Sequence, residues 1–285
     1  MDSATETSSP HAATMQQPMA RAGLRASSYG PSEPFPAADY WAEASAEFAA
    51  SLENAAPALI WIIGEIEFGD AGGDVRLKFP APEETPIDEH VLFGDADLTE
   101  SYLSQFDETG VQVWLQVEPG DADIAELIEL VIGRYGGHPC VVGFGVDLEW
   151  YGWSPENDAG TAASDAEAQI WSEQVRAYNS DYKLFLKHWE IEKMPPSYRA
   201  GLLFLDDSQG FDSLDSMLDE FQVWGEAFAT GDVAFQFGYE VDQIWWGQME
   251  NPAKVISQAI NSRVSNASEF YWVDFTMQQI WPRNE

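Results

Sequence analysis

The chain has 285 residues but only one cysteine and four histidines. Because Cys140 has no second cysteine to pair with, an intrachain disulfide and a metal site of several cysteines are both excluded. The histidines do not show the spacing of metal ligands, so we expect neither a metal nor a cofactor. No apolar run reaches the ~18 residues that a membrane-spanning helix needs. Composition thus favours a globular protein without disulfides.

Basic residues are also scarce. Lys and Arg total 13 against 49 Asp and Glu, which gives a formal net charge of −36. A surface of this charge repels nucleic acid and anionic membranes, so we expect neither as a partner. It also repels itself unless salt screens it. The acid-rich, lysine-poor usage resembles that of haloarchaeal proteins, and we expect a halophilic protein; an acidic mesophilic protein is the alternative. The oligomeric state is left open.

The first 36 residues are rich in Ser, Ala, Pro and Thr and show no periodicity, so we expect a disordered leader over 1–36. This stretch has no apolar centre and is not an intact signal peptide. The triplet Asn266-Ala267-Ser268 fits a glycosylation sequon, which favours an extracellular or cell-surface location. A cytoplasmic location is the alternative.

Strand-like and helix-like patterns alternate through 37–285, which predicts a single domain with a parallel sheet. The strand-like segments are 57–68, 74–80, 110–119, 141–149, 182–190, 201–207, 232–242 and 269–277. Eight strands are what a (β/α)8 TIM barrel needs, and such barrels place their active site at the carboxyl ends of the strands. An open doubly wound sheet is the alternative, although no Gly-rich phosphate turn supports it.

The stretch from Val141 to Trp153 is the most informative part of the chain. Its apolar run with small residues at alternate positions predicts a buried strand. Because side chains alternate along a strand, Gly143, Gly145, Asp147 and Glu149 share one face. Two carboxylates at the end of a buried strand are costly unless they are solvated, paired or used in chemistry. We therefore regard Asp147 and Glu149 as candidate catalytic residues.

Other acids and several tryptophans also fall at predicted strand ends. Aromatic side chains bind the flat C–H faces of sugar rings, while carboxylates bind their hydroxyls, so this combination indicates a carbohydrate substrate. The candidate substrate-binding residues are Trp150, Trp189, Trp272, Glu67, Glu118 and Asp274. Lys187 is one of few cations and is expected to neutralise part of the acidic cluster.

The segment GFGVDLE, residues 143–149, resembles the strand-four motif D-G-x-D-x-D-x-E of family-18 glycoside hydrolases, the chitinase-like (β/α)8 enzymes. The resemblance implies that Glu149 protonates the leaving oxygen and that Asp147 orients the acetamido group of the substrate. It further implies a supporting tyrosine and a tryptophan floor, for which Tyr239 and Trp272 are similar by position. Val142 and Gly145 replace the two earlier acids of the motif.

Three other functions are considered. Many barrel glycosidases use an acid on strand four and a carboxylate nucleophile on strand seven, which Glu149 and Glu240 would supply. A carbohydrate-binding barrel without turnover is favoured by the missing motif acids. A metal-dependent enzyme would use Glu65, Glu118 and Asp147, since carboxylates suit Mg²⁺ or Mn²⁺.

Overall fold

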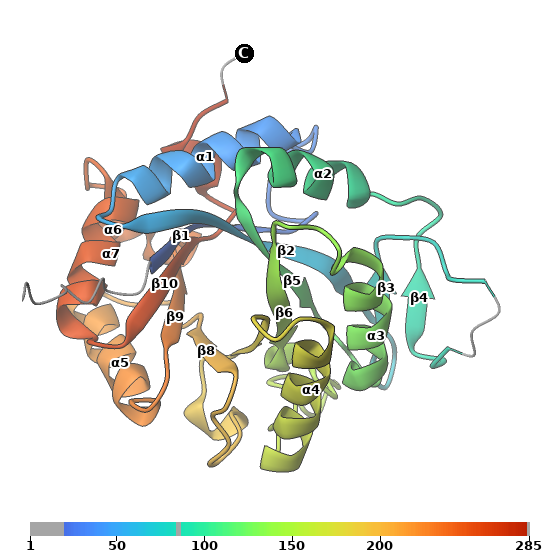
Figure 1. The fold of residues 1–285 in the computed structure, drawn as a ribbon. Helices are drawn as coiled ribbons and strands as arrows, with labels where there is room; N and C mark the ends of the chain where they lie inside the picture. Colours follow the sequence, from blue (N-terminus) through green and yellow to red (C-terminus); the bar gives the residue numbers. More distant parts are fainter. Residues whose placement is uncertain (1–19, 84–86, 284–285) are drawn as a thin grey trace, which may run out of the picture.

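The computed structural model describes residues 20–83 and 87–283, and eight parallel strands form a closed barrel at its centre (Figure 1). The barrel strands are β1 (Ala20–Ala26), β2 (Ala55–Phe68), β5 (Gln112–Val117), β6 (Val141–Asp147), β7 (Lys183–Lys187), β8 (Leu202–Asp206), β9 (Val233–Phe237) and β10 (Ala267–Trp272). The barrel closes because β1 pairs in parallel with both β2 and β10. The predicted (β/α)8 TIM barrel is confirmed.

Helices surround the barrel (Figure 1). The longer ones are α1 (Ala38–Ala50), α2 (Glu100–Thr109), α3 (Ile124–Tyr135), α4 (Asp165–Tyr178), α5 (Leu214–Ala227) and α7 (Pro252–Arg263). Short turns of helix follow several strands: η1 (Leu148–Trp150), η2 (Ile191–Lys193), η3 (Glu240–Asp242), α6 (Gln243–Trp246) and α8 (Met277–Ile280). Ser164 caps α4 in a reciprocal capping box, as its sequence predicts. No helix among the described residues is long and apolar enough to cross a membrane.

The first barrel strand lies in the region for which we expected a disordered leader. That expectation is wrong for residues 20–26, which form β1; residues 1–19 lie outside the described part of the chain. Ala22 and Leu24 pack into the core between barrel and helices, while Arg21 and Arg25 turn inward to bonds with Glu269 and Asp274. The strand is stable here because its outer face is buried and its inward arginines are paired.

The second predicted strand is not part of the barrel. Residues 73–77 form β3 (Gly73–Leu77), which pairs antiparallel with the long end of β2 and carries β4 (Val91–Phe93) on its other edge. Figure 1 shows this extension to the right of the barrel. The alternating pattern of one strand does not reveal which strand it pairs with. The predicted set of eight therefore has the correct number of strands, but it includes β3 in place of β1.

Two apolar cores result from the alternation of side chains along the strands. Inside the barrel lies a small cluster that includes Trp114, Phe185 and Tyr271. A much larger cluster fills the layer between barrel and helices and includes Trp272, which is fully buried. The carboxyl end of the barrel, above the inner cluster, is where polar side chains gather.

Candidate active site at the carboxyl ends of the strands

A cavity of about 500 Å³ opens at the carboxyl ends of the barrel strands. It is lined by Arg25, Tyr29, Glu65, Ile66, Phe68, Glu118, Asp147, Glu149, Trp150, Lys187, Asp207, Gln209, Gln236, Tyr239 and Phe275. A second cavity of about 400 Å³ shares Glu149, Asp207 and Gln209 with it and extends to Trp189. Glu149 therefore stands where the two cavities meet.

A buried cation between two carboxylates forms the floor of the cavity. The Lys187 ammonium lies 2.7 Å from Asp147 Oδ2 and 2.6 Å from Asp207 Oδ2, and all three side chains are almost fully buried. Asp147 and Lys187 end the neighbouring strands β6 and β7 and are register partners. Burial raises the pKa of Asp147 to about 7 against the opposing effect of Lys187, and the negative charges of Asp207 and Glu118 add to the rise. Lys187 thus neutralises the cluster as the sequence suggested.

Glu149 differs from these paired acids. It lies one residue beyond Leu148, in the 3-10 turn η1 that follows β6, and is half-buried in the cavity wall. No hydrogen bond from another described residue reaches its carboxyl group. Burial raises the pKa of Glu149 to about 8, and the negative charge of Asp147 adds to the rise. At neutral pH this carboxyl group holds its proton, as a general acid must.

A second network fixes the opposite wall. The Arg25 guanidinium donates to Asp274 Oδ1 at 2.8 Å and to the Tyr29 hydroxyl. That hydroxyl donates to Glu118, whose other oxygen accepts from the Ile66 backbone N–H at 3.1 Å. Asp274 is buried beneath Arg25 and does not line the cavity, so its role here is to position the arginine.

Aromatic rings gather at the mouth of the cavity. Phe68 is exposed and contacts Trp150 and Trp153, with ring centroids 5.4 Å and 4.7 Å apart. Trp189 borders the second cavity and stacks on His188 at 4.2 Å. These partly exposed rings offer flat apolar faces on both sides of Glu149.

Four of the predicted site residues lie outside the cavity lining, namely Asp274, described above, and the three that follow. Trp272 faces outward into the helical layer and donates to Thr276 Oγ1, because the alternation of β10 turns Tyr271 inward instead. Glu67 is exposed on the β2–β3 extension, where it pairs with Arg76. Glu240 is exposed in η3 and does not line the cavity. The tryptophan floor and the pairing of Glu149 with Glu240 are therefore not formed.

The other predicted residues do come together. Asp147, Glu149, Glu118, Trp150 and Tyr239 line the first cavity, and Trp189 lines the second. The sequence reading missed Arg25 and Tyr29, since both lie in the supposed leader. The signal was present: ARAGLRA, residues 20–26, alternates small apolar residues with Gly and Arg.

The acids proposed for a metal-dependent enzyme are each held by other partners. Glu65 pairs with Lys78 at 2.6 Å, and Glu118 and Asp147 have the partners described above. Among the described residues, the one group with suitable metal-ligand geometry is Asp107, His138 and Cys140. It joins the end of α2 to the loop before β6, at the opposite end of the barrel, and its members bond to one another.

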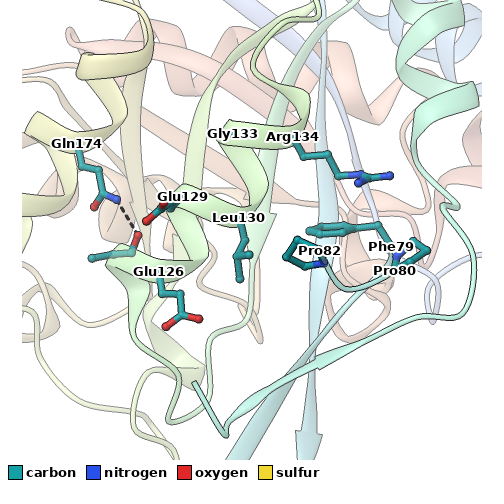
Figure 2. A pocket seen from close by; sticks show the side chains of 10 residues that line it. Phe79, Pro80, Pro82, Glu126, Glu129, Leu130, Gly133, Arg134 and Gln174 are labelled. Carbon is teal, nitrogen blue, oxygen red and sulfur yellow. Dashed lines mark hydrogen bonds between the residues drawn. The ribbon is translucent and has the colours of Figure 1, made fainter. Parts of the chain in front are cut away.

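Another hollow, of about 540 Å³, lies on the outer surface rather than at the strand ends (Figure 2). Figure 2 shows Phe79, Pro80 and Pro82 facing the α3 side chains Leu130 and Arg134 across it. The Gln174 amide donates to the Ala125 carbonyl at 2.7 Å. None of the acids with a raised pKa described above lines it, so the barrel mouth rather than this hollow is the candidate site.

Comparisons with known proteins agree on the fold. No protein-family model and no curated protein matches the sequence. The structure is similar to a protein assigned as an alpha-L-fucosidase from Bacteroides thetaiotaomicron, with a TM-score of 0.57 and 8% identity over 99% of this chain and 97% of that one. It is also similar to endo-glycoceramidase II from Rhodococcus sp., with a TM-score of 0.50 and 11% identity over 89% and 72%. These barrel neighbours are glycoside hydrolases.

Proposed function

We propose that the protein is a glycoside hydrolase that acts on an oligosaccharide or polysaccharide, with Glu149 as the general acid. The observation that carries the proposal is the state and place of Glu149. It is a half-buried carboxyl group whose pKa is raised to about 8, and it lies where two cavities meet at the carboxyl ends of the strands of a (β/α)8 TIM barrel. The glycoside hydrolases among the structural neighbours support the same class.

The chemistry follows from where the charges lie. A glycosidic bond breaks when an acid protonates the leaving oxygen while positive charge develops at the anomeric carbon. Glu149 supplies the proton, a water molecule then adds its oxygen to the anomeric carbon, and the proton that this water loses restores the protonated acid. The carboxylates of Asp147 and Asp207 are fixed by Lys187 and stabilise the developing positive charge without having to reorganise. The rings of Trp150 and Trp189 bind sugar units on either side of the bond.

The substrate-assisted mechanism of family-18 enzymes has less support than this general scheme. In that mechanism the residue aligned with Asp147 shares its charge with a second acid, where this chain has Gly145. Here Asp147 is ion-paired with Lys187 instead. A non-catalytic carbohydrate-binding barrel is the second candidate function, because the same ion pair restrains Asp147 and the motif acid is absent.

The test is hydrolysis of a panel of disaccharides, whose leaving oxygens are strongly basic, in molar KCl by the parent protein, by Glu149→Gln and by Glu43→Gln. Glu43 is an exposed acid on α1 that does not line the cavity, and it serves as the matched control. We expect turnover by the parent and the control, and a loss of roughly 10²–10⁴-fold in Glu149→Gln. Sugar binding without turnover in all three proteins would favour the binding module instead.

A further inference from the structure

We propose that the cavity selects a glycoside whose sugar carries a free, protonated amine over the corresponding neutral or anionic sugars. This inference rests on the proposed function, since it names the substrate class of the same site. Its basis is the charge of the cavity wall, which contains five carboxyl groups and two cations. The carboxyl groups belong to Glu65, Glu118, Asp147, Glu149 and Asp207, and the cations are Arg25 and Lys187.

Both cations already have carboxylate partners. Lys187 contacts Asp147 and Asp207 at 2.7 Å and 2.6 Å. Arg25 donates to Asp274, Ser27 and Tyr29, and lies 4.8 Å above the Tyr29 ring. Each cation is thus already paired with a carboxylate, although the Arg25 Nε donor is buried without a partner, and no other cation among the described residues lines the cavity. The carboxylate of a uronic acid would therefore meet the carboxylates of Glu118 and Asp207.

The hydrogen-bonding groups show the same imbalance. The Tyr29 hydroxyl donates to Glu118, and the Gln236 amide donates to the Tyr239 hydroxyl, so these donors are used within the wall. Three acceptors on lining side chains, Asp147 Oδ1, Asp207 Oδ1 and Gln236 Oε1, are buried without a partner among the described residues. Unpartnered buried acceptors are costly, and a ligand rich in N–H and O–H donors complements such a wall.

An ammonium group has two further favourable partners. It stabilises the ionised form of Asp147, whose pKa burial has raised, whereas a negative charge does the opposite. The rings at the cavity mouth, Trp150, Phe68 and Phe275, also attract a cation to their faces. An N-acetylated sugar lacks the charge for either contact.

The experiment measures binding of four methyl glycosides by calorimetry, those of glucosamine, N-acetylglucosamine, glucose and glucuronic acid. We expect the glucosaminide to bind about tenfold or more tightly than the glucoside at moderate salt, and the glucuronide to bind most weakly. The advantage of the amine should shrink as salt rises and as the amine loses its proton. Glu118→Gln and Glu65→Gln each should reduce that advantage severalfold, whereas Glu43→Gln should leave it unchanged. Two cavity variants are used so that, if circular dichroism shows that one of them is misfolded, the other still tests the inference.

Several results would overturn the inference: equal or tighter binding of the glucoside or the N-acetylglucosaminide, tight binding of the glucuronide, or binding of none of the four sugars. The binding result tests this inference separately from the hydrolysis result, which tests the proposed function. Turnover of neutral glycosides with no preference for the amine rejects the inference and retains the hydrolase. Tight binding of the glucosaminide with no hydrolysis of any glycoside supports the inference and rejects the hydrolase.

Discussion

Gly145 on β6 makes room for the ring of Phe185 on β7. A Cβ atom at position 145 would lie 2.0 Å from Phe185 Cζ, and the ring itself packs against Trp114 inside the barrel. This is the position at which the chitinase-like motif has an acid. The absence of the acid thus goes together with a change in the packing around it, because the Phe185 ring fills the space that its carboxyl group would need.

Gly145→Asp is therefore expected to destabilise the protein without supplying a second catalytic acid. Overpacking a core typically costs about 1–3 kcal/mol, and a buried carboxyl group adds to that cost. Chemical denaturation of Gly145→Ala isolates the steric part. Gly137→Ala is the matched control, since no atom lies within 4 Å of a Cβ there. If the Gly145→Ala protein were as stable as the control, the close packing of Phe185 against Gly145 would be contradicted. If adding Phe185→Leu restored part of the lost stability, this packing would be supported.

Lys187→Met should destabilise the barrel more at pH 8 than at pH 5. Removing one partner of a buried ion pair typically costs about 3–5 kcal/mol, because the remaining charges are uncompensated. Without the cation the pKa of Asp147 rises further, so the stability of the variant is present while Asp147 is protonated and is lost as this group ionises with rising pH. Lys183→Met on the same strand removes a half-exposed pair with Asp232 and should cost under about 1 kcal/mol. Equal melting temperatures for the two variants at pH 8 would reject this assignment.

Asp147→Asn should move the alkaline limb of the pH–rate profile to lower pH. In the parent, kcat/KM is expected to fall as pH rises through about 8, where Glu149 loses its proton. The Asp147 carboxylate raises the pKa of Glu149, so its removal, with Lys187 still present, lowers that pKa. The profile of each protein is fitted between pH 5 and pH 10, with Glu43→Gln as the control. An unchanged alkaline limb would show that another group titrates.

Thermal stability should rise with KCl concentration. The net charge of −36 places many carboxylates near one another, and salt screens their repulsion. Most of the gain is expected by about 1 M, where the Debye length is only ~3 Å. A melting temperature that falls between low and molar KCl would exclude adaptation to salt.

Sequence patterns predicted the parts of the fold that depend on local periodicity. The strands from β5 onward and the helices that follow them combine strong alternation with clear caps. β1 was missed because its seven residues are mostly small and sit in a Ser- and Pro-rich context. β3 was assigned to the barrel because period-two alternation does not distinguish a barrel strand from a hairpin extension.

The candidate site likewise contains residues that local sequence patterns could predict and residues that they could not. Asp147 and Glu149 could be identified because they end a buried strand, whereas Arg25 and Asp274 meet across 249 residues of sequence. Trp272 was placed in the site from its position near a strand end, without regard to which face it occupies. Reading the alternation of Glu269, Tyr271 and Val273 would have turned Trp272 outward.

The most direct test of Glu149 as the general acid is how the loss of kcat/KM in Glu149→Gln depends on the leaving group of the substrate. A general acid matters most when the departing oxygen is strongly basic and little when it leaves unaided. We compare kcat/KM of the parent and Glu149→Gln on a dinitrophenyl glycoside and on a glycoside of the same sugar with an alkyl leaving group. A loss of about 10²-fold or more on the alkyl glycoside, with little loss on the dinitrophenyl glycoside, is the expected result. The same loss on both substrates would contradict the assignment of Glu149 as the general acid.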